Sequence, residues 1–275
     1  MVIKNTPFPY YFPSDQILTT PRQTIFVAYK RSHSFVSNNT HYRSQLGFSF
    51  TELSITMEKN YRNTGFVLLL LIPLMLIGFF PSYLSQLVNS KKSIHFLIHL
   101  HFWVAAIWII LMIVQPFLIR FKHNRLHKQL GKLSYLLFVL FELSLIPFII
   151  GHFRYALKSG SPTILISALL GLIFTGVLFG LAMFHRKTSS LHMRYMIALA
   201  FMFLFPPVGR IIIRVLGGSF LAAVHVNFTL INLILLALIF LDKKHQRNYQ
   251  PYLVGLSVFI FSQVSLHTSF VVFGL

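Results

Sequence analysis

The sequence predicts an all-α integral membrane bundle of seven transmembrane helices, with the N-terminus inside. Three observations support this prediction: the composition, the number of long apolar runs and the distribution of charge between them. The chain has 275 residues, of which 55% are hydrophobic and 11% are charged. Soluble proteins carry about 25% charged residues. We therefore expect the core to be the membrane-embedded bundle itself.

Seven apolar runs follow residue 63, and each is long enough to cross a bilayer. A hydrocarbon core about 30 Å thick requires about 20 apolar residues in a helix. The expected spans are approximately 65–83, 94–120, 130–150, 163–184, 191–216, 220–241 and 252–273. The fifth run contains Pro206 and Pro207. Because proline removes a backbone donor and clashes with the preceding turn, we expect this helix to kink or break there.

The basic residues set the expected orientation. The chain has 24 Lys and Arg against 5 Asp and Glu. The basic residues lie between apolar runs and in the N-terminal stretch, which is typical of topology signals and lipid contacts rather than of a nucleic-acid surface. With the N-terminus inside, the inner side carries thirteen Lys and Arg and the outer side five. The positive-inside rule then predicts a multi-pass protein of the inner cell membrane. Its expected partners are the lipid bilayer and other membrane subunits, and not nucleic acid.

The N-terminal stretch differs from the rest of the chain. Residues 1–62 show no sustained helical or strand period, which is typical of a disordered segment. We therefore divide the chain into a tail, 1–62, and a transmembrane domain, 63–275. Our hypothesis for the natural start is Met57, since an ordinary beginning of a multi-pass protein follows it. A genuine disordered tail is the equal alternative.

Histidines gather near the predicted outer surface. At a rise of about 1.5 Å per residue, His99 and His101 lie about 8 to 10 Å below the outer end of the second span. The candidate outer metal layer is His99, His101, His225 and His267. The alternative is that each histidine is an interfacial residue with its own hydrogen-bond partner.

Helix phase separates the polar residues of the second span into two stripes. One stripe holds His95, His99 and Trp103, and the other holds His101, Trp108 and Gln115. The two stripes lie on different faces of the helix, so they cannot both face the interior of the bundle.

Glu142 is the only acid within an apolar run, near the middle of the third span. An unpaired carboxylate at that depth is costly. We therefore expect it to be neutral, or paired with a histidine or with Arg210.

Two similar phrases lie beside the basic loops: LHKQLGK at 126–132 and LHMRYMI at 191–197. Each opens a helix that runs outward, so the two hairpins resemble a tandem repeat. In a four-helix core of this kind His127 and His192 face each other, as two axial haem ligands do. The alternative is that both histidines only hold helix starts near lipid phosphate.

These phrases, together with HxHFW near the start of the second span, resemble an uncharacterised group of bacterial multi-pass proteins akin to the DUF2306-type families. The resemblance covers about 94–214. The hairpin pair is more distantly similar to the cytochrome b561 core, in which histidines on four central helices hold two haems. The fourth span here has no histidine, so this chain departs from the two-haem pattern. His127 with His192 is the only match in position, and it implies haem b.

The sequence leaves several functions open. It has no P-loop, GxSxG, HExxH or paired acidic motif, so we do not expect an enzyme of those classes. The absence of cysteine excludes thiolate metal sites. The leading hypothesis is a redox or respiratory membrane protein that binds haem or a transition metal. One alternative is a cofactor-free transporter of a small solute, with His99, His101, Glu142 and His225 along its substrate or proton path. Another is an accessory membrane subunit.

Overall fold

The computed structural model describes residues 58, 61–89 and 94–274. Met57 and most of the predicted tail lie outside these residues. The described chain is helical and contains no strand. Two residues that the sequence places in the tail contact the bundle, because Glu58 forms ion pairs with it and Tyr61 is buried.

Seven helical spans are long and apolar enough to cross a membrane, as predicted. The first consists of α2 (Thr64–Leu69), α3 (Leu71–Phe79), the π-helical η2 (Phe80–Leu84) and α4 (Ser85–Asn89). The next three are α5 (Phe96–Arg120), α6 (Asn124–Ser159) and α7 (Thr163–Phe184). The fifth consists of α8 (Ser189–Met202), α9 (Phe205–Arg210) and the π-helical η3 (Ile211–Val215), and the last two are α10 (Phe220–Lys244) and α11 (Gln250–Phe273). The chain is therefore a multi-pass membrane protein.

The fifth span is interrupted, as its prolines predict. Helix α8 ends at Met202, and α9 begins at Phe205 with Pro206 and Pro207 in its first turn, where proline removes no helical hydrogen bond. The first span is interrupted as well, and η2 contains Pro81. The two interrupted spans meet where α3 packs against α9. A Cβ added to Gly78 would lie 2.6 Å from the backbone of Pro207, so only glycine permits this close crossing.

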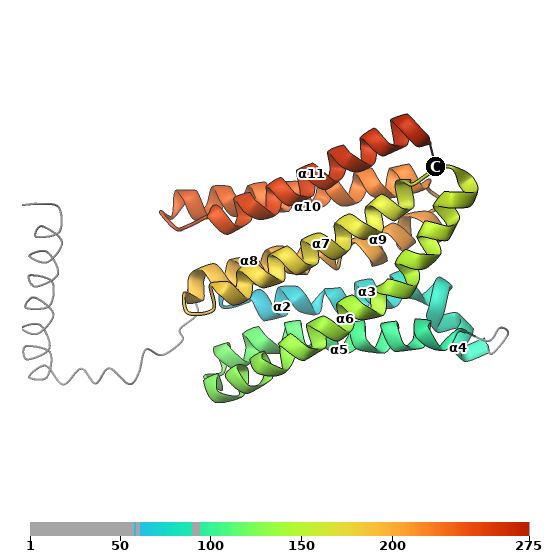
Figure 1. The fold of residues 1–275 in the computed structure, drawn as a ribbon. Coiled ribbons are helices and arrows are strands. Elements are labelled where there is room, and N and C mark those ends of the chain that lie inside the picture. Colours follow the sequence, from blue (N-terminus) through green and yellow to red (C-terminus); the bar gives the residue numbers. More distant parts are fainter. Residues whose placement is uncertain (1–57, 59–60, 90–93, 275) are drawn as a thin grey trace, which may run out of the picture. The chain divides into compact units, whose positions relative to one another are not determined.

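The six spans after the first form three antiparallel hairpins, α5–α6, α7–α8 and α10–α11 (Figure 1). Neighbouring contacts run from α2 to α5, from α6 to α7 and from α11 to both α7 and α8. Helix α9 then packs against α10 and α3 and completes a ring of helices.

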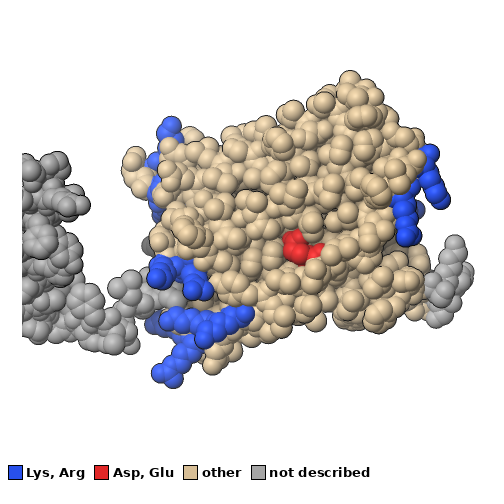
Figure 2. Space-filling view, viewed as in Figure 1, with Lys and Arg blue, Asp and Glu red and all other residues tan. Residues whose placement is uncertain are grey.

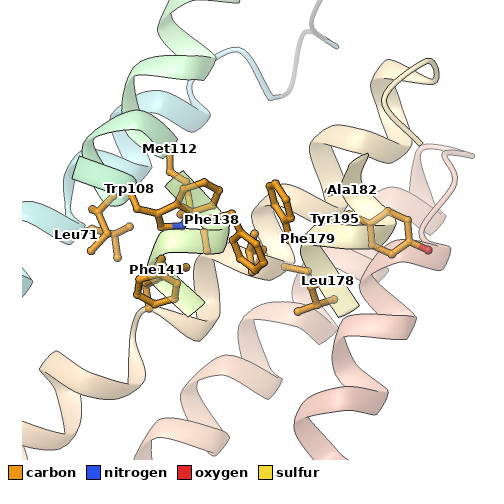
Figure 3. Close-up of a cluster of buried hydrophobic side chains, with 14 of the residues drawn as sticks. Leu71, Trp108, Met112, Phe138, Phe141, Leu178, Phe179, Ala182 and Tyr195 are labelled. Carbon is orange, nitrogen blue, oxygen red and sulfur yellow. The ribbon is translucent and has the colours of Figure 1, made fainter. Parts of the chain in front are cut away.

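Aromatic side chains fill the interior between α5, α6, α7 and α8 (Figure 3). Phe138 and Phe179 stack with their ring centroids 4.0 Å apart, and Trp108 packs against both rings. Such pairs contribute about 0.5–1.5 kcal/mol each beyond the area they bury. Inside a membrane, this close packing takes the place of the hydrophobic effect in holding helices together.

The charges separate along the spans. On the face shown in Figure 2, Lys and Arg lie at the two ends, and the belt between them is uncharged except for one acidic area. The α5–α6, α7–α8 and α10–α11 loops share one end, which we call the basic end. Helices α5, α7 and α10 begin at the other end (Figure 1), which we call the opposite end.

Candidate functional site

A partly open cavity of about 770 Å³ lies between the helices. All seven spans contribute to its lining, and most of the lining is apolar. Ile109, Phe141, Phe203, Phe228 and Phe259 are among its walls. Both interrupted spans border it, through α3 and η2 on one side and α8 and α9 on the other.

His101 and Arg210 provide the most polar part of the lining. Ser144 donates its one hydroxyl proton to the Phe141 carbonyl (2.6 Å), so it accepts from Nδ1–H of His101 at 2.8 Å. This bond leaves Nε2 as the acceptor nitrogen of the neutral ring. His101 lies five residues inside α5 and Arg210 five residues from the end of η3, so both are about 7.5 Å from the opposite end.

Arg210 has few partners for a guanidinium inside a membrane. Its Nη1 donates to the Pro206 carbonyl at 3.1 Å, and its Cζ lies 4.2 Å from the centroid of the Phe79 ring. Among the described residues, no Asp or Glu forms an ion pair with it. The cavity therefore contains a cation whose counter-charge the described chain does not supply.

Glu142 was expected to be neutral, or paired with a histidine or with Arg210. The structure gives it a different partner, because the Thr175 hydroxyl donates to its Oε1 at 2.7 Å. Thr175 belongs to the lining of the cavity, whereas Glu142 does not. Helix phase explains the result: Phe141 and Leu145 occupy the inward face of α6, and Glu142 lies beside that face.

The four histidines of the predicted outer layer do not converge. His99 bonds to the Tyr83 hydroxyl at 2.7 Å, and His101 faces the cavity. His225 and His267 pack against each other with ring centroids 5.7 Å apart. Within the described residues, no three His, Asp or Glu side chains form a group that could hold a metal ion.

The structure resolves which stripe of the second span points inward. His101 lines the cavity, Trp108 is 1% exposed, and both polar atoms of the Gln115 amide are buried. On the other stripe, Trp103 is 58% exposed.

His127 and His192 occupy equivalent positions, each the fourth residue of its helix. They lie close enough to interact electrostatically. Nδ1 of His192 donates to the Ala182 carbonyl at 2.8 Å, which leaves Nε2 as the acceptor of the neutral ring. Nδ1 of His127 and the Gln115 amide are buried and have no hydrogen-bond partner in the structure.

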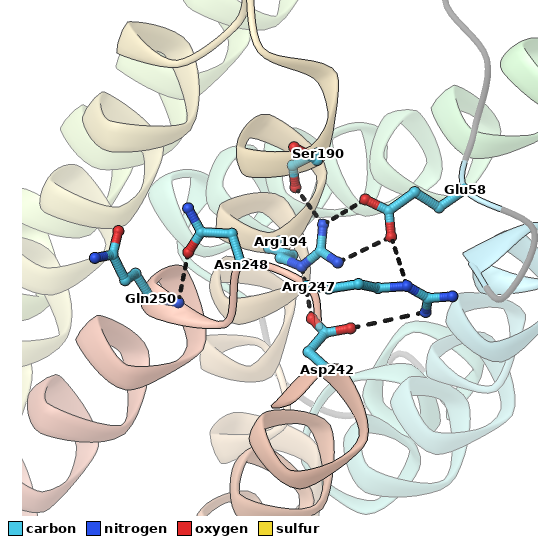
Figure 4. A network of polar contacts seen from close by, with 7 residues as sticks. All are labelled: Glu58, Ser190, Arg194, Asp242, Arg247, Asn248 and Gln250. Atoms are coloured by element: carbon cyan, nitrogen blue, oxygen red, sulfur yellow. Dashed lines mark hydrogen bonds and ion pairs between the residues drawn. The ribbon is translucent and has the colours of Figure 1, made fainter. Parts of the chain in front are cut away.

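A cluster of ion pairs at the basic end was not predicted from the sequence (Figure 4). Arg194 is 0% exposed; its Nε donates to Asp242 at 2.6 Å, and its Nη1 and Nη2 each donate to Glu58 at 2.9 Å. Arg247 approaches the same two acids. Burial in this cluster, reinforced by the Asp242 carboxylate, raises the pKa of Tyr61 to about 12. The available sequence signal was the scarcity of acids: the chain has 5 Asp and Glu, and one of them, Asp242, follows an apolar run directly.

Comparisons with protein-family models, with curated proteins and with solved structures give no match for this chain. The geometry described above is therefore the basis for the proposals that follow.

Proposed function

We propose that this protein is a membrane-embedded carrier that binds a lipid-soluble small molecule in the cavity bordered by its two interrupted spans. This is the cofactor-free, small-solute alternative expected from the sequence. The observation that supports it best is the cavity: about 770 Å³, mostly apolar walls, and a few polar side chains, among them His101, His152 and Arg210. A concave, mostly apolar site with a few convergent polar groups is the usual form of a small-molecule site.

The position of the cavity favours carriage over a purely structural role. Many secondary transporters form their substrate sites from discontinuous helices near the middle of the bilayer. Here the two interrupted spans cross where Gly78 packs against Pro207. Other residues of both spans line the cavity. Short, interrupted helices can rearrange with little loss of helical hydrogen bonding, because their ends are already open.

The charge asymmetry supports an orientation for this carrier. We propose that the basic end faces the cytoplasm, in accord with the positive-inside rule, and that the protein belongs to the inner cell membrane. The cavity then lies nearer the outer leaflet, since His101 and Arg210 are close to the opposite end.

Filling the cavity tests this function. Gly171 lines the cavity, and a Cβ added there would meet no atom within 4 Å. Gly180 lies on the same helix with the same open space, but outside the lining. We expect Gly171→Leu to lose the binding of oleyl alcohol, measured by native mass spectrometry of the purified protein, and Gly180→Leu to retain it. Equal binding by both variants would contradict the proposal.

The inner histidine pair is a second candidate site, for the haem or transition metal of the leading sequence hypothesis. Its donor set fits an axial pair, because a backbone carbonyl orients His192 and leaves its Nε2 available, as around many ligating histidines. His127 has an unpartnered buried nitrogen. Haem bound there would supply one-electron chemistry.

An optical spectrum tests this second candidate. Haem held by the pair should give a Soret band with near-stoichiometric iron, and His127→Ala or His192→Ala should abolish it. His123→Ala is the matched control, because His123 is exposed at the same end of the bundle. A purified, folded protein that takes up no haem from a haem titration would exclude haem at this pair.

A further inference from the structure

We infer that the molecule bound in the cavity has an anionic head, a carboxylate or a phosphate, that pairs with Arg210. This inference rests on the proposed function and specifies the chemical class of the ligand.

The cavity lining has a fixed positive charge and no fixed negative charge. Among the described residues of the lining, Arg210 is the one Lys or Arg, and none is Asp or Glu. The other described acids have partners elsewhere: Glu58 and Asp242 pair with Arg194, and Glu142 bonds to Thr175. A cation inside a membrane is costly without a counter-charge. An anionic ligand supplies the charge that the described chain does not.

The guanidinium is held in a position to receive such a head. One face packs on Phe79, and Nη1 is fixed by the Pro206 carbonyl. A guanidinium carries five N–H donors, so most of its donors remain for a ligand. Its planar fork matches the oxygens of a carboxylate or phosphate. Phe79 and Arg210 both line the cavity, so the head site opens into it.

His101 adds a complementary group at the same depth. Its Nδ1 is committed to Ser144, and its Nε2 is an acceptor in the neutral ring. A head group that is charged but retains an O–H, such as a phosphate monoester, can accept hydrogen bonds from Arg210 and donate one to Nε2 of His101. A phosphate should therefore bind more tightly than a carboxylate.

The rest of the cavity fits an apolar tail. Helix α5 lines the cavity from Ile98 to Ile110. The helix rises about 12 Å between His101 and Ile109, so the lining extends that far below His101. The deep part is bounded by side chains such as Phe141 and Phe203, and the Thr175 hydroxyl there is already bonded to Glu142. An amphipathic molecule is thus oriented with its head toward the opposite end and its tail toward the bilayer centre.

The test compares three probes with one tail: oleyl phosphate, oleate and oleyl alcohol. Each is titrated by native mass spectrometry into the wild type, into Arg210→Gln and into Arg214→Gln. Arg214 is the matched control, because it lies one turn beyond Arg210 and is exposed outside the cavity lining. Charge-assisted hydrogen bonds correspond to a preference of about tenfold or more for the anionic probes over the alcohol. We expect Arg210→Gln to abolish this preference without weakening the alcohol, and Arg214→Gln to retain it.

Each other outcome has a definite meaning. Failure of the wild type to bind any of the three probes would remove the proposed function together with this inference. Binding of all three probes with equal affinity would overturn the anionic head alone. A preference lost equally in both variants would assign the effect to general surface charge and also overturn it. A fourth probe, phosphatidate, tells whether the phosphate head belongs to a membrane lipid or to a solute. Tighter binding than oleyl phosphate indicates a two-chain membrane lipid. Weaker binding than oleyl phosphate indicates a single-chain solute.

Discussion

Arg194 and Arg210 belong to the same interrupted span, but their surroundings differ. Arg194 is 0% exposed and bonds to Asp242, Glu58 and the Ser190 carbonyl. Arg210 bonds only to a carbonyl of its own helix and rests on an aromatic ring. The first arginine has two acidic partners in the described chain and the second has none.

This difference separates a structural charge from a functional one. A buried ion pair with complete partners joins elements, and Arg194 joins α8 to α10 and to the segment that precedes α2. Arg210 is partly buried and faces the cavity without an acidic partner among the described residues, so it has no such role in the free protein. The predictions below test this distinction, from the largest expected effect to the smallest.

Removal of the Arg194 side chain should have the largest effect on stability. Arg194→Leu leaves Asp242 and Glu58 without their main cation. Breaking one side of a buried ion pair costs about 3–5 kcal/mol. Arg210→Gln should change the free energy of unfolding by less than about 1 kcal/mol, because no acid loses its partner. Unfolding of both variants in detergent, followed by circular dichroism, measures the two effects, and equal losses would remove the distinction.

The two acids of the cluster should differ in the same way. The Asp242 side chain is 1% exposed and that of Glu58 is 29% exposed. We expect Asp242→Asn to lower the free energy of unfolding by about 2–3 kcal/mol and Glu58→Gln by about 1 kcal/mol, since water replaces part of the second interaction. The same unfolding measurement decides the order. A larger loss for Glu58→Gln would show that the N-terminal segment contributes more than its exposure indicates.

The crossing of the interrupted spans can be tested with Gly78. Its Cβ in Gly78→Ala would lie 2.6 Å from backbone atoms of Pro207, so α3 and α9 must separate. Overpacking of this kind costs about 1–3 kcal/mol. Because α9 carries Arg210, we also expect weaker binding of oleate. Gly131→Ala is the control, since its Cβ meets no atom within 4 Å, and it should not destabilise the protein. Wild-type stability in Gly78→Ala would contradict the described crossing.

The last prediction concerns the ionisation of Tyr61. Its pKa is raised from 10.0 to about 12, so the folded state retains the phenolic proton more strongly than the unfolded chain. The corresponding stability is fully present below pH 10 and is lost as the pH rises toward 12. An ultraviolet difference titration of the wild type against Tyr61→Phe should show one phenol that ionises near pH 12. Ionisation near pH 10 would place Tyr61 in water.

Apolar run length and the paired prolines predicted the seven spans and the break in the fifth, because these features depend on local chemistry. The sequence also identified His101 and Arg210 as candidate site residues. Helix phase showed that one of two polar stripes of the second span faces inward, but not which one. The cavity itself could not be predicted. It depends on how seven helices pack, and on a contact between Gly78 and Pro207 that are far apart in the chain. The pairing of Arg194 with Glu58 and Asp242 likewise joins distant segments.

The most direct test of the central claim is thermal unfolding of the wild type and Arg210→Gln, each with and without saturating oleate. A ligand that binds only the folded state raises the unfolding temperature. We predict equal unfolding temperatures without oleate, a rise with oleate in the wild type and no rise in Arg210→Gln. A variant that is already destabilised without oleate, and that responds to oleate as the wild type does, would show that Arg210 is a structural residue like Arg194.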